Sequence, residues 1–224
     1  MTGWLGDGDG PMGDHGAFMD SELQVPRADL AAHIRQLEGP RNLIALVGAP
    51  GSGKSYLARQ LAQALGDEAA IVPMDGFHQD NAWLDARGLR AVKGAPQTFD
   101  VAALHACLER LRDAREPCTV PIFDRDIDAV VPDGDTVPAR ARYILIEGNY
   151  LLLTQPGWRD LYPLFDLSVR IEVPEAELRA RLIRRWQQQG FAPDIISKKV
   201  EQNDLPNGRV MLREGRAADL VVRD

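Results

Sequence analysis

The sequence is poor in cysteine and contains no long apolar run. Its 224 residues include two cysteines, Cys107 and Cys118, without a C-x-x-C pair, which argues against a zinc site or a disulfide scaffold and favours a reducing, cytoplasmic setting. No apolar stretch approaches the roughly 18 to 20 residues needed to cross a bilayer, so we expect no membrane insertion. The glycine- and aspartate-rich N-terminus lacks the regions of a signal peptide. We expect a flexible tail at residues 1–20 and one domain at residues 21–224.

Positive charge is also scarce. The chain has 26 lysine and arginine residues against 33 aspartate and glutamate residues, a net charge of −7. A protein that binds duplex nucleic acid usually carries a basic stripe, whereas the one basic cluster here is confined to Arg179–Arg185. We therefore expect no nucleic-acid partner. The length and the 45% apolar content suit an ordinary globular domain with a full core.

Short apolar runs alternate with segments of helical periodicity. The runs, typical of strands buried on both faces, lie at residues 42–47, 69–74, 143–146, 167–173 and 219–223. Apolar residues recur at helical spacing in residues 27–37, after Gly53, after Asp100 and around residues 178–186. This alternation predicts an α/β fold with a mostly parallel five-stranded sheet covered by helices on both faces.

Three of the predicted strands end in residues suited to chemistry. The first ends at a glycine-rich loop that begins at Gly48, the second at Asp75 and the third at Glu147. In parallel sheets, ligands bind beyond the carboxyl ends of the strands. We therefore expect the loop and both carboxylates at one edge of the sheet, with the Asp75 strand next to the loop strand.

The loop Gly48–Ser55 reads G-A-P-G-S-G-K-S and fits the phosphate-binding pattern G-x-x-x-x-G-K-[ST]. Glycines let backbone N–H groups turn toward phosphates, and the following helix adds its positive N-terminus. Lys54 is expected to reach the β- and γ-phosphates and Ser55 to ligate Mg²⁺. The alternative, a chance match, is disfavoured by the strand before the loop and the amphipathic helix after it. The expected ATP contacts are Gly48, Ala49, Pro50, Gly51, Ser52, Gly53, Lys54, Ser55 and Tyr56.

The two carboxylates have different expected roles. Glu147 follows an apolar strand, where it can hold magnesium directly or through water; the alternative is a solvated acid. Asp75, in M-D-G-F-H, can accept the proton of an acceptor hydroxyl, which a kinase needs and a hydrolase does not. The alternative for Asp75 is a turn-forming Asp-Gly pair, and its position alone does not decide between them.

Four segments in order resemble a known family. P-M-D-G-F-H, K-G-A-P-Q-T-F-D (Lys93–Asp100), P-I-F-D-R (Pro121–Arg125) and I-L-I-E-G-N-Y-L-L-L (Ile144–Leu153) are similar to segments of the phosphoribulokinase, uridine kinase and bacterial pantothenate kinase group. The match covers most of residues 40–190 and is strongest to bacterial putative fructose transport system kinases. The resemblance implies a P-loop NTPase fold, a three-layer α/β/α sandwich with a helical lid, for residues 21–224.

The resemblance also implies roles for single residues. Asp75 becomes the catalytic base. The acceptor pocket is expected to involve Asp75, Phe77, His78, Lys93, Asp124, Arg125 and Glu147. A structural histidine is an equal alternative for His78, and a turn with a surface charge is the alternative for Asp124 and Arg125. Phe99 is expected in the core.

The basic cluster is expected to form part of the lid. On a helix, Leu178, Leu182 and Trp186 share one side, and Arg181, Arg184 and Arg185 project from the other. A solvated helix face is the usual outcome for such a run. The resemblance instead implies that lid arginines stabilise the transferred phosphoryl group. Arg181 and Arg184 match its spacing best, and Gly190 can serve as the hinge.

The late segment Asn203–Arg209 contains Asn207-Gly208, first of all a turn signal. The resemblance implies that this segment lies near the nucleotide base, with no residue singled out.

These expectations together describe a cytoplasmic kinase. It would use ATP and Mg²⁺ to phosphorylate a hydroxyl of a small metabolite, such as a sugar like fructose, a nucleoside or pantothenate, with a role in carbohydrate metabolism suggested by the resemblance. ATP rather than GTP is favoured because no N-K-x-D motif occurs. The likeness also favours a homodimer. The alternative is a regulatory nucleotide-binding ATPase associated with sugar transport, which would not need a base or an acceptor pocket.

Overall fold

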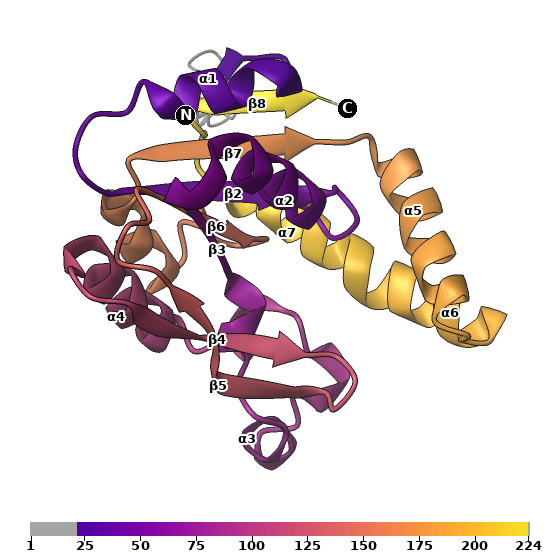
Figure 1. The fold of residues 1–224 in the computed structure, drawn as a ribbon. Coiled ribbons are helices and arrows are strands. Elements are labelled where there is room, and N and C mark those ends of the chain that lie inside the picture. Colours follow the sequence, from indigo (N-terminus) through magenta and orange to yellow (C-terminus); the bar gives the residue numbers. More distant parts are fainter. Residues whose placement is uncertain (1–21, 224) are drawn as a thin grey trace, which may run out of the picture.

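The computed structural model describes residues 22–223, which form a six-stranded parallel sheet with helices on both faces (Figure 1). The order across the sheet is β1-β8-β7-β2-β6-β3. Its strands are β1 (Leu23–Gln24), β2 (Asn42–Gly48), β3 (Ala69–Pro73), β6 (Tyr143–Gly148), β7 (Leu167–Glu172) and β8 (Leu220–Arg223). The expected tail at residues 1–20 lies outside the described residues.

The expected sheet is correct in type and one strand short. All five predicted strands form, and each pairing in the sheet is parallel. The sixth strand, β1, is two exposed residues that pair with β8. A strand of two residues is too short to show a periodic pattern, so the sequence gives no signal for it.

The apolar strands separate two layers of core. In β2, Leu43, Ala45 and Val47 belong to one buried cluster, and Ile44 and Leu46 belong to the other. Because successive strand residues point to opposite faces, the two clusters lie on the two sides of the sheet. The first cluster includes residues of α4 (Val101–Asp113) and α7 (Leu205–Glu214), and the second includes residues of α1 (Leu30–Arg35) and α2 (Lys54–Leu65). This is the expected three-layer arrangement.

The helix boundaries follow local chemistry. α2 begins after Gly53 and is followed by Gly66, and both glycines have positive φ, a conformation that glycine adopts without steric strain. The Asp100 side chain caps α4 by accepting a hydrogen bond from the Ala103 N–H over 2.9 Å, as a preferred N-cap residue does.

The prediction for the neighbour of β2, the strand that leads into the Gly48–Ser55 loop, is wrong. We expect β3 beside β2, but β6 lies between them and β3 is an edge strand. The burial of the strands explains the order. β6 is buried along its whole length, whereas β3 is mostly half-buried and ends in Pro73, a residue tolerated at a sheet edge.

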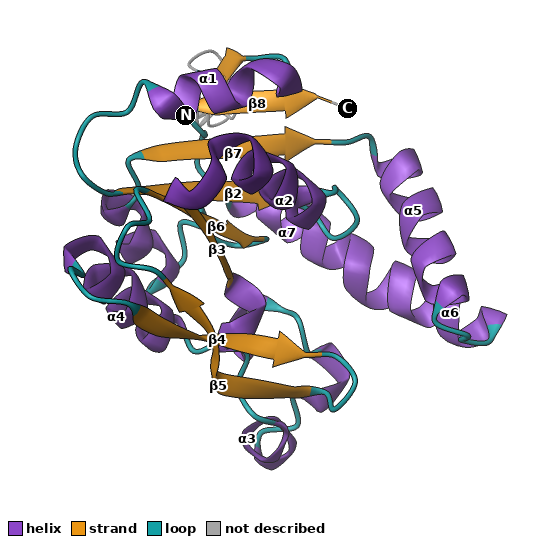
Figure 2. Cartoon of the chain, viewed as in Figure 1, coloured by secondary structure: helices purple, strands orange, loops and turns teal. Residues whose placement is uncertain are grey.

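Two projections lie at the strand ends. A hairpin of β4 (Cys118–Asp124) and β5 (Ala129–Val137) is antiparallel, and an arm is formed by α5 (Glu175–Gln188) and α6 (Pro193–Lys199) (Figure 2). α3 (Asn81–Ala86) precedes the hairpin in the chain. The short helical turns are 27–29, 66–68, 74–77, 90–92, 96–98 and 158–164, and a π-helix spans Val200–Asp204. Within residues 22–223, no helix combines the length and apolarity needed to span a membrane.

The expected turn at Asn207-Gly208 is also wrong, because both residues lie inside α7. A Cβ atom added to Gly208 would lie 3.1 Å from the Cβ of Ala49. The glycine therefore allows α7 to approach the Gly48–Ser55 loop closely, and it does not end the helix.

Candidate functional site

The Gly48–Ser55 loop connects β2 to α2 and leaves the helix N-terminus open. Gly51 and Gly53 have φ of 82° and 87°, which favour glycine. Among the described residues no side chain caps α2, so its first N–H groups can bind an anion. The Ser52 Oγ atom is buried without a hydrogen-bond partner among the described residues. The loop therefore fits a phosphate group.

Helices from the C-terminal half lie directly against this loop. A Cβ atom on Gly51 would lie 3.0 Å from Leu182 Cγ on α5, and Gly208 on α7 faces Ala49 as described above. A pocket of about 430 Å³ adjoins the loop between the end of β7, α5 and α7. Its lining is mostly apolar and also contains three charged side chains: Ala49, Ile171, Val173, Pro174, Leu178, Met211 and Leu212, with Glu172, Glu175 and Arg223.

Ser55 and Glu147 meet beside the loop. Ser55 Oγ donates a hydrogen bond to Glu147 Oε1 over 2.8 Å, and Glu147 is buried near the end of β6, the neighbour of β2. Hydroxyl and carboxylate oxygens are ligands that Mg²⁺ prefers, so the pair fits the ion. Residues 22–223 contain no group of three or more His, Cys, Asp or Glu side chains that could hold a metal. An ion here would need phosphate or water oxygens to complete its shell.

Asp75 lies just beyond β3 and forms an ion pair with the hairpin. Arg125 Nη2 donates to Asp75 Oδ2 over 2.9 Å, and both side chains are partly exposed, 58% for Arg125 and 36% for Asp75. A Cβ atom on Gly76 would lie 2.2 Å from the Pro121 carbonyl oxygen. Glycine at this position therefore lets β4 pack onto the Asp75 turn and brings Arg125 to the carboxylate.

His78 lies behind Asp75 in an aromatic layer. Its Nδ1 is 2.9 Å from the Asp75 carbonyl oxygen, and its ring centroid is 4.0 Å from that of Phe99 and 5.0 Å from that of Phe123. Burial lowers the pKa of His78, although the charge of Asp75 opposes this. The imidazole is therefore neutral at pH 7. Its surroundings give it a packing role in addition to any contact with an acceptor.

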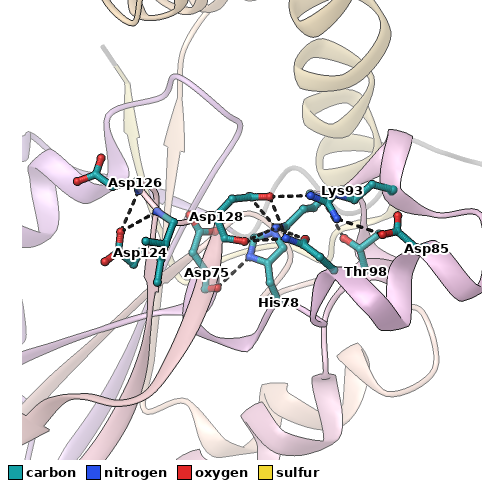
Figure 3. A network of polar contacts seen from close by, with 12 residues as sticks. Asp75, His78, Asp85, Lys93, Thr98, Asp124, Asp126 and Asp128 are labelled. Atoms are coloured by element: carbon teal, nitrogen blue, oxygen red, sulfur yellow. Dashed lines mark hydrogen bonds and ion pairs between the residues drawn. The ribbon is translucent and has the colours of Figure 1, made fainter.

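Lys93 is held by the tip of the hairpin (Figure 3). Its Nζ contacts Asp128 Oδ1 at 2.7 Å, the Asp128 carbonyl at 3.2 Å and Asn81 Oδ1 at 2.8 Å. Asn81 and Arg90 also donate to Asp128 Oδ2, both over 3.1 Å. We call these four residues, Asn81, Arg90, Lys93 and Asp128, the hairpin latch. The sequence predicts Lys93 here but neither Asn81 nor Asp128, which lie 12 and 35 residues from it.

The remaining predicted acceptor residues are placed differently. Phe77 is buried in the core. The Asp124 carboxylate accepts hydrogen bonds from the N–H groups of Asp126 at 2.9 Å and Ile127 at 3.4 Å, so it closes the hairpin turn (Figure 3). These two side chains shape the site. Asp75 and Arg125, in contrast to the buried Phe77, have partly exposed side chains.

The arginines of α5 differ in environment. Arg181 Nε donates to Glu177 Oε1 over 2.8 Å on the same helix, and Arg184 is exposed. Arg185 is half-buried. Its pKa is lowered by burial and by repulsion from Arg125, and Asp204, Asp75 and Glu147 oppose this through attraction. Of the three arginines, Arg185 is the one whose pKa responds to the charges of Asp75, Arg125 and Glu147.

Asp204, a residue for which the sequence gives no signal, anchors α5. Trp186 Nε1 donates to Asp204 Oδ2 over 2.7 Å, and burial raises the pKa of this carboxyl. Nearby, Asn203 Nδ2 donates to the Lys93 carbonyl over 3.3 Å. The π-helix and α7 therefore connect the arm, the Gly48–Ser55 loop and Lys93. Gly190, with φ of 78°, lies in the turn between α5 and α6.

Comparisons with known proteins identify relatives along most of the chain. A putative uridine kinase of Schizosaccharomyces pombe is 33% identical over 195 residues, which cover 82% of this chain and 83% of that protein. The crystal structure of a putative fructose transport system kinase from Silicibacter sp. TM1040 is 42% identical, with a TM-score of 0.82 over 88% of this chain and 98% of that one.

More distant similarities are partial. Pantothenate kinase of Bradyrhizobium sp. is 30% identical over 155 residues, 64% of this chain, and the chain matches 49% of its length. Phosphoribulokinase from Rhodobacter spheroides has a TM-score of 0.53 over 75% of this chain and 67% of its own, at 15% identity, so that likeness is one of fold. No protein-family model matches the chain.

Proposed function

We propose a specific reaction for a chain that belongs to the P-loop small-molecule kinases of the uridine kinase, pantothenate kinase and phosphoribulokinase group. As a member, it is an ATP-dependent phosphotransferase with an alcohol group as acceptor. The proposed acceptor is a hydroxyl of a small metabolite. Sugars such as fructose, nucleosides and pantothenate are the candidates that the names of its relatives suggest.

The arrangement of Ser55, Glu147 and Asp75 supports this proposal most directly. The strands β2, β6 and β3 are neighbours in that order, and they carry the phosphate loop, Glu147 and Asp75 at the same edge. The Ser55–Glu147 contact of 2.8 Å is at one end and the Asp75–Arg125 pair of 2.9 Å at the other. A nucleotide on the loop would thus direct its terminal phosphate toward the side on which Asp75 lies.

The nucleotide is proposed to lie across the loop. Backbone N–H groups at the start of α2, with Lys54, would bind the phosphates. The base would occupy the mostly apolar pocket of about 430 Å³ beside Ala49. Ser55 and Glu147 would hold Mg²⁺, which when bound supplies positive charge to the phosphate oxygens.

In the proposed transfer, the acceptor oxygen forms a bond to the γ-phosphorus while the bond from that phosphorus to the β–γ bridging oxygen breaks. The hydroxyl proton passes to the Asp75 carboxylate, and ADP leaves. Lys54 and the arginines of α5 would stabilise the charge that spreads over the γ-phosphoryl oxygens. Arg181 and Arg184 are proposed for this by resemblance, and Arg185 by its surroundings.

The proposal is tested by ATP consumption with Mg²⁺ across sugars, nucleosides, pantothenate and glycerate, with a no-acceptor control. We expect turnover with at least one acceptor and a decrease of about 10²- to 10⁴-fold in Asp75→Asn. ATP affinity in the variant should be unchanged, because Asp75 lies on the acceptor side. Equal turnover in every well, unaffected by Asp75→Asn, would instead favour the regulatory ATPase.

A further inference from the structure

We propose that the phosphoryl acceptor carries an anionic group, a carboxylate or a phosphate, and that Arg125 binds this group beside the reacting hydroxyl. The inference rests on the proposed function and narrows its substrate class. It follows from what Arg125 contacts, what it leaves open, and how the neighbouring cations are engaged.

Arg125 covers the carboxylate that the reaction needs. Its Nη2 donates to Asp75 Oδ2 over 2.9 Å, so an acceptor hydroxyl must compete with the guanidinium for Asp75. A neutral acceptor offers Arg125 no contact of equal strength. A carboxylate or phosphate offers a charge-assisted, bidentate hydrogen bond, and can therefore draw Arg125 from Asp75 as the hydroxyl arrives.

Most of the hydrogen-bonding capacity of Arg125 is unused. A guanidinium has five N–H donors, and among residues 22–223 the side chain of Arg125 has Asp75 as its one hydrogen-bond and ion-pair partner. The side chain is 58% exposed, so its other donors remain accessible. A planar fork of donors is the group best suited to bind carboxylate or phosphate.

The lysine of the same region is already engaged. Lys93 has three N–H donors, and three acceptors lie within 3.2 Å of its Nζ, two on Asp128 and one on Asn81. Its side chain is 15% exposed. Arg90 is likewise paired with Asp128 and Asp85. Within the latch and its neighbours, Arg125 is thus the cation with free donors beside Asp75.

The backbone that carries Arg125 is held on both sides. Asp124 accepts hydrogen bonds from two backbone N–H groups of the turn. Asp128 binds the hairpin to three side chains outside it, those of Asn81, Arg90 and Lys93. Asp128 is also the one non-glycine residue among those described that has positive φ, 51°. A long, partly exposed side chain on a fixed turn can change partner without moving the backbone, which lowers the entropic cost of binding.

The positive charge of Arg185 favours the same ligand. Among the neighbouring charges, Arg125 has the largest effect on the pKa of Arg185, a residue of α5, and lowers it. Arg125 and Arg185, which lie on separate elements, are therefore close enough for each positive charge to act on the other. An anionic group on the acceptor, together with the terminal phosphate of ATP, would neutralise both.

The experiment compares acceptors in matched pairs that differ in charge. The pairs are glycerate with glycerol, pantothenate with panthenol, and fructose 6-phosphate with fructose, so that carboxylate and phosphate are tested separately. Dissociation constants are measured by calorimetry with a non-hydrolysable ATP analogue and Mg²⁺, and turnover is measured with ATP. We expect the anionic member of at least one pair to bind about ten- to a hundredfold more tightly than its neutral partner.

Arg125→Gln should abolish that difference, and Arg125→Lys should restore part of it, since lysine keeps the charge but not the fork. Arg213→Gln, an exposed position near the end of α7, is the matched control and should keep it. Thermal melting confirms that each variant is folded.

Two results would overturn the inference. One is the absence of tighter binding for every anionic member in the wild type. The other is a neutral acceptor that binds as tightly as its anionic partner and is phosphorylated in an Asp75-dependent reaction. The kinase function would then stand, and the acceptor would not need an anionic group. ATP hydrolysis that is equal with all compounds and insensitive to Asp75→Asn would contradict the proposed function itself.

Discussion

Gly208 on α7 lies against Ala49 in the phosphate loop, so closely that a Cβ on the glycine would be 3.1 Å from the Cβ of the alanine. The contact joins the last helix of the chain to the first functional loop. Gly208 has neither a positive φ nor a position at a helix end. Close approach is therefore the reason for glycine here, and its effect should appear in nucleotide binding.

We expect Gly208→Val to lower the affinity for MgATP about tenfold, because the branched side chain would push α7 away from Ala49 and open the adjoining pocket. Gly208→Ala should have a much smaller effect, since a shift of a few tenths of an ångström accommodates one methyl group, and alanine favours the helix by about 1 kcal/mol. Calorimetric titration with a non-hydrolysable ATP analogue measures both. Wild-type affinity in Gly208→Val would show that the contact is unimportant for the nucleotide.

The Ser55–Glu147 pair leads to a prediction about magnesium. Glu147→Gln keeps a carbonyl oxygen that can accept from Ser55 Oγ but removes the negative charge, so the fold should be kept and the ion held less tightly. We expect the Mg²⁺ concentration for half-maximal activity to rise about tenfold or more, with saturating magnesium restoring part of the rate. Activity is measured as a function of Mg²⁺ at fixed ATP. An unchanged magnesium dependence would argue that Glu147 acts elsewhere than at the ion.

The buried strands and the phosphate loop were predictable because their signals are local. β2 and β6 are continuous apolar runs, and the loop motif is contiguous in sequence. The order of the strands was not predictable from the sequence. β6 lies between β2 and β3 because it is the more buried strand, and the order of segments in the chain does not encode this.

The β4–β5 hairpin was missed because its strands lack apolar alternation. They contain Pro121, Gly134 and acidic residues, and Gly134 is needed because Ile122 packs on it. The latch was missed for a related reason, since Asn81, Lys93 and Asp128 converge only after the hairpin folds back.

The latch itself makes a prediction about stability. Lys93→Met should destabilise the protein by about 1–3 kcal/mol, because Asp128 and Asn81 would lose partners that they hold inside a partly buried network. The pairwise energy of Lys93 and Asp128 should be smaller, about 1 kcal/mol, since Asp128 is 50% exposed and solvent screens the pair. A double-mutant cycle of Lys93→Met and Asp128→Ala by urea unfolding measures both values.

A different result is expected if Lys93 binds the acceptor, as the sequence resemblance implies. Lys93→Met would then lower activity with an unchanged free energy of unfolding. The two readouts therefore separate a positioning lysine from a ligand-binding one.

The latch should also respond to acid. Burial raises the pKa of Asp128, but the hydrogen bonds from Lys93 and Asn81 and the charges of Lys93 and Arg90 outweigh burial, and the net pKa lies below its usual value. The group thus contributes stability above the unfolded-state pKa of about 3.9 and loses it as the pH falls through the folded-state pKa. Asp128→Asn should therefore be less stable than the wild type at pH 7, and the difference should begin to narrow below about pH 4. Urea unfolding at several pH values measures the difference in stability between the two proteins. If this difference is constant from pH 7 to pH 3, the negative charge of Asp128 is not its source.

Asp204 should behave in the opposite way. Burial raises the pKa of its carboxyl, and the hydrogen bond from Trp186 and the charges of Arg185, Lys199 and Lys54 only partly oppose this. Its contribution to stability is therefore fully present below the unfolded-state pKa of about 3.9 and is lost as the pH rises through the folded-state value. Asp204→Asn keeps an oxygen that can accept from Trp186 Nε1 but carries no charge. We expect the variant to be more stable than the wild type at pH 7, by about 1.4 kcal/mol for each unit by which folding raises the pKa.

Tryptophan fluorescence tests the contact between Trp186 and Asp204 directly. Subtracting the spectrum of Trp186→Phe isolates the signal of Trp186. Thermal melts of Asp204→Asn and the wild type from pH 4 to pH 8 should diverge as the pH rises. If the variant is instead less stable at every pH, the ionised carboxylate must be paired more strongly than its burial indicates. Asp204 would then hold the α5 arm in place through its charge, since the amide would keep the Trp186 hydrogen bond and still fail to support the arm.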